Sequence, residues 1–232
     1  MSKRSKRYQK AAELVEEDKQ YALEEAVGII KKFPAPKFDP TVTLAFNMGV
    51  DPRKSDQMVR GSVALPHGTG KSVKVVVFAT GDAAKAATEA GADEVGMEEL
   101  IKKIQGGYTD FDAAVATPDA MLEVRKIARV LGPRGLMPNP KTGTVTEDTA
   151  TAVNAVKAGR IDYKLDKNGN IAAAVGKASF SEDQLLANTQ ALIESVVKAK
   201  PASAKGNYIQ NVTIAASMCP GVSLENSLYA TN

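Results

Sequence analysis

The two ends of the chain share one pattern of hydrophobic and polar positions. From residue 41 to 48, Val42, Leu44, Phe46 and Met48 alternate with polar or smaller residues, which predicts a strand buried on one face. Further strands are expected at 59–65, 160–165, 171–175 and 208–216. Residues 166–170, which contain Asn168 followed by a glycine, predict a hairpin connection between two of them.

Helices accompany these strands. Apolar residues spaced by three and four predict a helix over 21–32, and the capping-box pair Ser181 and Gln184 predicts the start of another that runs to about residue 200. Residues 11–17 suit the beginning of a shorter helix. Both ends of the chain therefore predict an α+β fold with an antiparallel sheet.

The middle of the chain follows a different pattern. Residues 73–79 and 111–116 are almost continuously apolar, as in strands covered on both faces. A shorter strand is expected at 94–96. Helices are expected at 83–90, capped by Asp82, at 98–105, from Thr117 and Pro118 to 131, and at 147–158. Such alternation predicts βαβ units and a parallel sheet.

These patterns predict two domains. Either terminal segment, of about seventy residues, is near the lower size limit of a stable domain, whereas the two together are not. We expect a discontinuous domain, 1–67 with 160–232, forming an antiparallel α+β sandwich, and an inserted Rossmann-like α/β domain, 68–159. The two chain crossings would form a hinge at Gly68, Gly70 and Gly159.

Charge and composition narrow the choice of partners. The net charge is +3, of which the two terminal segments carry +4 and the middle −1, so the terminal domain is the better polyanion surface. A basic arm precedes it, with Lys3, Arg4, Lys6, Arg7 and Lys10. The single cysteine, Cys219, excludes an internal disulfide and fits a reducing compartment. No signal-peptide or membrane-spanning pattern is present.

Two glycine-rich stretches invite a phosphate-binding interpretation. Gly70, Lys71 and Ser72 match the end of a phosphate loop, but Leu65 stands where its first glycine belongs and Ser72 opens a strand instead of a helix, so we reject that assignment. In the loop 131–144, Gly132 and Gly135 would leave backbone amides accessible to an anion. A rigid loop that caps the sheet is the alternative.

An enzyme built on the α/β middle is the main rival class, and a protein-docking module is a further one. The turn 79–82 lacks the dinucleotide fingerprint. His67 is the one histidine, so neither a metal cluster nor a His-based catalytic triad is evident. Cys219 has no nearby sequence partner and suits a buried or interface thiol.

Several specific motifs together resemble one family. The chain is similar, from about residue 31 to 222, to the family of bacterial large-subunit ribosomal protein one, found at the mobile lateral stalk beside the tRNA exit site. The motifs lie at 51–57, 59–61, 65–71, 131–141, 166–169, 176–180 and 198–201. Departures from the family pattern are Ala172, where a histidine is usual, and Cys219, where a glycine is usual.

The resemblance implies a ribosomal protein without enzyme activity or cofactor. Its implied location is the cytoplasm, in the large ribosomal subunit. Implied partners are large-subunit ribosomal RNA at the stalk ("stalk RNA" below), the protein's own operon mRNA and exit-site tRNA, with no membrane and a monomeric free protein. The implied roles are release of deacylated tRNA and translational repression. Implied RNA-binding residues are Lys37, Phe38, Thr41, Lys177, Ser179, Ser217, Met218 and Cys219.

The chemistry of these side chains agrees with that implication. Lys37 offers a partner for phosphate, and Phe38 an aromatic face for a base or ribose. Ser217 and the backbone of Met218 suit sugar hydroxyls. For Phe38 and Met218 the alternative is packing in the core.

Overall fold

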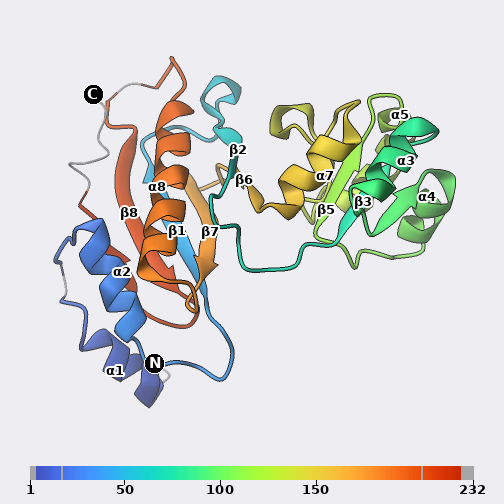
Figure 1. Ribbon diagram of the computed structural model, residues 1–232. Helices are drawn as coiled ribbons and strands as arrows, with labels where there is room; N and C mark the ends of the chain where they lie inside the picture. Colours follow the sequence, from blue (N-terminus) through green and yellow to red (C-terminus); the bar gives the residue numbers. More distant parts are fainter. Residues whose placement is uncertain (1–3, 17, 205, 226–232) are drawn as a thin grey trace. The chain divides into compact units, whose positions relative to one another are not determined.

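A computed structural model describes residues 4–16, 18–204 and 206–225. The chain divides into two compact units (Figure 1). Unit 1 combines Met1–Gly70 with Ile161–Asn232, and unit 2 is Lys71–Arg160. These boundaries fall within three residues of the expected ones, and the ability of unit 1 to fold alone stays a prediction.

Unit 1 is built on an antiparallel sheet. Its described strands run in the order β7 (Asn170–Lys177), β1 (Thr41–Met48), β8 (Ile209–Ala216) and β9 (Gly221–Ser223). Helices α2 (Leu23–Lys32) and α8 (Glu182–Lys198) pack on this sheet (Figure 1). The predicted antiparallel sheet of both termini is confirmed, whereas β9 was not predicted.

The alternation in β1 decides which face of the sheet is covered. Val42, Leu44 and Phe46 are buried in one core with apolar residues of β7, β8 and both helices. The residues between them are more exposed and form an open face of small, uncharged side chains. Ser181 and Gln184 make the predicted capping box at the start of α8.

The predicted hairpin is wrong in its strand pairing. The turn itself forms: the carboxylate of Asp166 accepts hydrogen bonds from the amides of Asn168 and Asn170, both at 2.8 Å. However, β6 (Arg160–Lys164) pairs with β2 (Arg60–Ala64), while β7 pairs with β1. A local turn determines where the chain reverses, but the partner of each strand depends on where its apolar side chains are buried.

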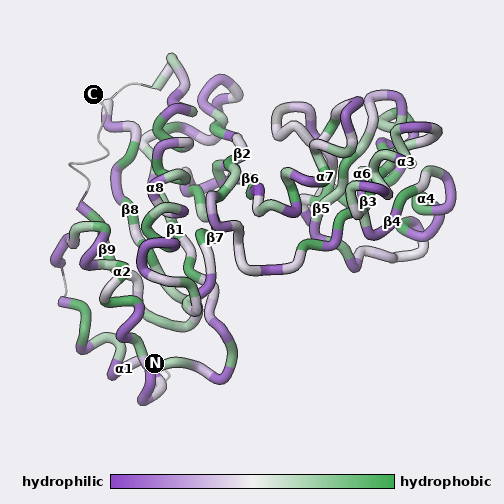
Figure 2. Tube along the Cα trace, viewed as in Figure 1, coloured by the Kyte–Doolittle hydropathy of each residue, from purple (hydrophilic) through white to green (hydrophobic). Residues whose placement is uncertain are grey.

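Unit 2 contains the predicted parallel sheet, in the order β4 (Glu94–Gly96), β3 (Val75–Phe78) and β5 (Ala113–Ala116). Alternate residues of β3 and β5 face opposite cores, and hydrophobic residues follow these strands in Figure 2. One core includes α4 (Glu98–Gln105) and the segment 120–131, and the other α3 (Asp82–Glu89) and α7 (Thr149–Lys157).

Several helix boundaries differ from expectation. Helix α1 (Lys6–Ala12), capped by the Ser5 hydroxyl, includes part of the basic arm, so it begins before the short helix expected at 11–17 and ends at Ala12. Gly81, not Asp82, is the N-cap of α3. The helix expected after Thr117 consists of α5 (Met121–Val124), η2 (Arg125–Ile127) and α6 (Ala128–Leu131). Two further short helices are η1 (Ser55–Gln57) and η3 (Pro140–Thr142).

In the loop after α6, the amides of Gly132 and Gly135 are bonded within the chain and are not available to an anion. The amide of Gly135 donates to the carbonyl of Gly132, and that of Leu136 to the carbonyl of Leu131. With Gly135 at φ 74°, these bonds form a Schellman motif that closes the helix end. The alternative of a rigid loop is therefore favoured.

The predicted hinge glycines have distinct surroundings. Gly68 and Gly70 belong to unit 1, and the Gly68 carbonyl accepts a hydrogen bond from Asn188 at 2.9 Å. A Cβ on Gly70 would lie 2.7 Å from the Phe180 ring. Gly159 follows α7 at φ 102°. Gly68 and Gly70 are thus fixed to unit 1, and the hinge itself stays a prediction.

Candidate RNA interface

Thr41, the first residue of β1, connects the segments that carry the predicted RNA-binding residues. Its hydroxyl accepts a hydrogen bond from the Lys177 ammonium group at 2.9 Å. Its carbonyl accepts two from Ser217, from the amide at 3.0 Å and from the hydroxyl at 3.2 Å. The structure therefore brings the start of β1, the end of β7 and the turn after β8 together, as expected from the sequence.

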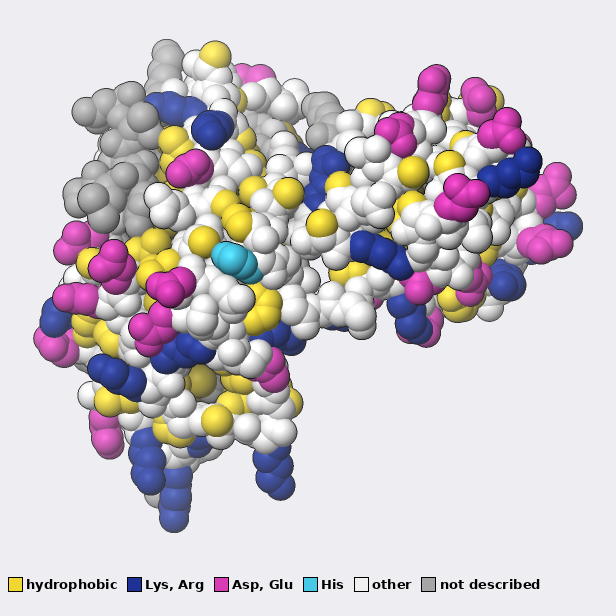
Figure 3. Space-filling model, viewed as in Figure 1, with side chains coloured by type: hydrophobic (Ala, Val, Ile, Leu, Met, Phe, Trp, Pro, Cys, Tyr) yellow, Lys and Arg dark blue, Asp and Glu magenta, His cyan; other side chains and the backbone are white. Residues whose placement is uncertain are grey.

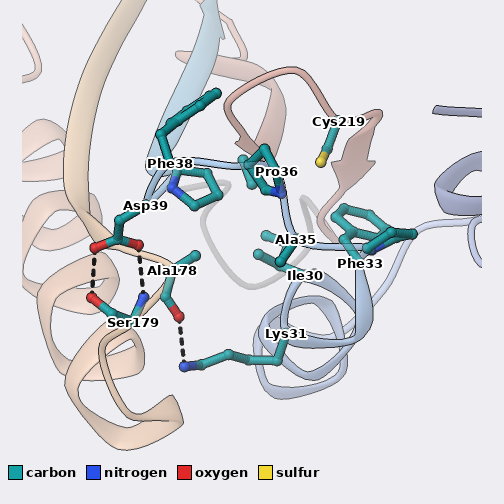
Figure 4. Close-up of a pocket in the computed structure, with 13 residues that line it drawn as sticks. Ile30, Lys31, Phe33, Ala35, Pro36, Phe38, Asp39, Ala178, Ser179 and Cys219 are labelled. Carbon is teal, nitrogen blue, oxygen red and sulfur yellow. Dashed lines mark hydrogen bonds between the residues drawn. The ribbon is translucent and has the colours of Figure 1, made fainter. Parts of the chain in front are cut away.

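A second set of contacts holds the segment before β1. The Asp39 carboxylate accepts hydrogen bonds from the Ser179 amide at 3.2 Å and hydroxyl at 2.7 Å (Figure 4). Lys31, on α2, donates to the Ala178 carbonyl at 2.8 Å. Sequence reasoning missed Asp39 and Lys31, since nothing in the local pattern shows that they reach a segment about 140 residues away. The Ser179 side chain is thus bonded to Asp39 next to the residues around Thr41.

Phe38 and Met218 are not core residues. The relative exposure is 48% for Phe38 and 70% for Met218, among the most exposed large apolar residues that the structure describes. Met218 also has a φ of 61°, which is unfavourable for a residue with a Cβ. Both alternatives of core packing are wrong, and each apolar side chain is available to a partner.

Lys37 precedes Phe38 and is exposed. In the described part of the chain, its ammonium group has no hydrogen bond or ion pair, in contrast to Lys177, which is bonded to Thr41. An unpaired ammonium group next to an exposed aromatic ring suits a phosphate beside a base or ribose.

A pocket of about 280 Å³ lies beside these residues. Figure 4 shows its lining, with apolar walls from Ile30, Phe33 and Pro36 and a rim that includes Phe38 and Ser179. The lining also includes Cys219. In this turn the residue with a positive φ is Met218. Cys219 therefore does not need the backbone freedom of the glycine that is usual at this position in the family that the chain resembles.

Alkylation of Cys219 is expected to be slow at neutral pH. Burial raises the pKa of the thiol, and the nearby Arg7 cation opposes that rise only in part. Because the thiolate is the nucleophile, the iodoacetamide rate should increase with pH to beyond about 8.5, the pKa of an unperturbed cysteine. Mass spectrometry of samples taken at successive times measures the alkylation rate. Equal rates for the native and urea-unfolded protein at pH 7 would contradict the expectation.

The open face of the sheet continues from the site. Ala172, where the resembling family usually has histidine, is exposed on β7 opposite Ala45 of β1. Asn47 donates from its side-chain amide to the Asn170 side-chain oxygen at 3.1 Å. The side chain of Ala172 is small, so this face of the sheet is accessible to a flat or convex partner.

The His, Cys, Asp and Glu side chains of the described residues include no group of three or more arranged to hold a metal ion. The helices of these residues include none with the length and apolar character needed to cross a bilayer.

Comparisons with known proteins give a consistent result. Residues 30–220 match the Ribosomal protein L1p/L10e family. The chain is 56% identical over 225 residues to "Large ribosomal subunit protein uL1" of Saccharopolyspora erythraea, covering 97% of this chain and 94% of that one. The protein of the same name from Beutenbergia cavernae is 55% identical over 227 residues, which cover 98% and 95%. That of Mycobacteroides abscessus is 54% identical over 225 residues, covering 97% and 96%.

Proposed function

This chain belongs to the ribosomal protein L1p/L10e family, and from that premise we propose that it binds stalk RNA through the surface centred on Thr41. It is a ribosomal protein of the large subunit and not an enzyme. The proposed binding residues are those expected from the sequence: Lys37, Phe38, Thr41, Lys177, Ser179, Ser217, Met218 and Cys219.

The observation that carries the proposal is the exposure of Phe38 and Met218 beside the hydrogen-bonded segments around Thr41. Phe38 lies in the segment just before β1, and its exposed aromatic ring offers a stacking surface to a base. Lys37 adds a phosphate contact next to it. The acidic group of this segment, Asp39, accepts hydrogen bonds from the Ser179 amide and hydroxyl, which fix its position but leave its charge in place.

Repression of the protein's own translation would use the same surface. A segment of the protein's own mRNA that presented the shape of stalk RNA would bind to it as well, so that excess free protein would repress its own translation. We also propose that rotation about the chain crossings near Gly70 and Gly159 accompanies the release of deacylated tRNA from the exit site. Since the mRNA and stalk RNA would bind the same surface, the two RNAs should compete for the protein.

Unit 1 alone is expected to keep most of the affinity for stalk RNA. A protein that joins residues 1–70 to 161–232 through a short linker retains all the proposed contacts, so its affinity should lie within about tenfold of the full chain. Filter binding at several salt concentrations, with residues 71–160 alone as the control, measures this. A loss of about a hundredfold or more in a folded unit 1 would show that the site is wrongly assigned.

A further inference from the structure

Arg7, on helix α1, lies against the turn that carries Met218. Its Nη2 atom donates a hydrogen bond to the Met218 carbonyl at 3.3 Å. Its Nη1 atom is buried and has no hydrogen-bond partner among the described residues. Buried polar atoms are normally bonded, and a cationic nitrogen without a partner is the more costly case. Among the described residues nothing pairs with this nitrogen, while the side chain as a whole is only partly buried.

The position of Arg7 is determined by the fold and not by a free arm. Ala11 of the same helix is fully buried in the core of unit 1, and the Ser5 hydroxyl accepts the Tyr8 amide at 3.3 Å. A shallow pocket of about 250 Å³ borders both α1 and the segment after the turn, with Arg4 on one side and Pro220 on the other. The helix is thus packed beside the β8–β9 turn.

An anion from outside the chain could approach the exposed Nη2 side of the group, which bonds to Met218, but not the buried Nη1 atom. In the described part of the chain, Arg7 forms no ion pair with an Asp or Glu side chain. Lys and Arg side chains gather at the end of unit 1 where Figure 1 places α1 (Figure 3). An arginine fork can hold a carbonyl with one nitrogen and an anionic oxygen with its other donors, which a lysine cannot do in the same plane.

We propose that Arg7 is an RNA-binding residue: it holds the Met218 turn in place and receives a phosphate of the RNA strand that lies over this turn. The proposal rests on the proposed function, because it deepens the same site by adding helix α1 as a further side. A phosphate is favoured over an acidic protein because the residue that Arg7 holds, Met218, already belongs to the RNA surface. Lys3, of the same basic arm, lies outside the described residues.

Substitution of Arg7 by glutamine and by lysine shows how much of the effect is due to charge. Arg7→Gln removes the charge, and its shorter side chain does not reach the Met218 carbonyl as the arginine does. In filter binding of the full chain to stalk RNA, its affinity should fall about tenfold, and the slope of log affinity against log salt should become shallower by about one unit. Arg7→Lys keeps the charge and should keep the slope.

Arg4→Gln is the matched control on the same helix. The Arg4 guanidinium lies over the Tyr8 ring, 4.8 Å from its centre, and does not contact the turn, so its loss should change the slope by much less than one unit. Equal changes for both glutamine variants would mean that α1 attracts RNA only by its general charge, and the proposal would fail. It would also fail if folded Arg7→Gln bound stalk RNA with the affinity and slope of wild type.

A measurement on the wild-type protein covers the case in which Arg7→Gln does not fold. Phenylglyoxal modifies accessible arginines, and mass spectrometry locates the products. Bound stalk RNA should block modification of Arg7 but not of Arg125, an exposed arginine of unit 2. Modification of both at unchanged rates would overturn the assignment of Arg7. If wild type binds no stalk RNA at all, the proposed function fails, which is a different result from binding that leaves Arg7 unprotected.

Discussion

Replacing Phe38 with alanine is expected to weaken the binding of stalk RNA by about 1–3 kcal/mol, which corresponds to roughly five- to 150-fold. The ring is half exposed, and its loss removes a stacking surface without opening a cavity in the core. Because stacking releases few counterions, the salt dependence of binding should stay as in wild type. Filter binding at four or more salt concentrations measures both quantities.

The neighbouring lysine should behave in the opposite way. Lys37→Ala is expected to make the slope of log affinity against log salt shallower by about one unit, since one phosphate contact is lost. Met58→Ala, another exposed apolar residue of unit 1, and Lys198→Ala, at the exposed end of α8, are the matched controls. Both should bind like wild type.

The results for the Phe38 and Lys37 variants would distinguish RNA binding at this surface from a structural role of Phe38 and from an RNA site elsewhere. If Phe38→Ala loses its circular dichroism signal, the ring has a structural role that its exposure does not reveal. If the Phe38 and Lys37 variants both bind like wild type, the surface around Thr41 is not the RNA site. The basic helix α1 would then be the first alternative.

Replacing Asn188 with alanine is expected to destabilise unit 1 by about 3 kcal/mol. The side chain is completely buried on α8 and has three hydrogen-bond partners. It donates to the Gly68 carbonyl at 2.9 Å and the Val175 carbonyl at 2.7 Å, and accepts from the His67 amide at 3.0 Å. Alanine would leave these backbone groups without a partner, which costs more than the loss of an exposed bond.

Urea unfolding followed by circular dichroism measures this difference. Gln190→Ala, an exposed change on the same helix, should alter the unfolding free energy by about 0.5 kcal/mol or less. If the two variants unfold alike, Asn188 does not hold the segment with Gly68 to the unit. If they differ as expected, Asn188 holds the segment with Gly68 to unit 1. A hinge would then bend the chain after this segment, close to Gly70 or beyond it.

Local patterns predicted most of the elements. The strict alternation of Val42, Leu44 and Phe46 determines that β1 is buried on one face, and the structure has this strand at the expected residues. The Ser181 and Gln184 pair determines where α8 begins, since both hydrogen bonds of a capping box form within four residues. The apolar runs of β3 and β5 predicted strands covered on both faces. The motifs also indicated the family and, through it, the candidate RNA-binding residues.

Other features depend on residues that are distant in the sequence, and only the tertiary structure decided them. The turn at Asp166 was predictable, but the pairing of β7 with β1 and not with β6 was not, because strand partners follow from where the apolar faces are buried together. Phe38 is exposed at a pocket that is also lined by residues of α2 and of the segments after β7 and β8, and no local pattern encodes that arrangement. Arg7 meets Met218 across 211 positions of sequence, and such contacts arise only when burial of the core has brought their elements together.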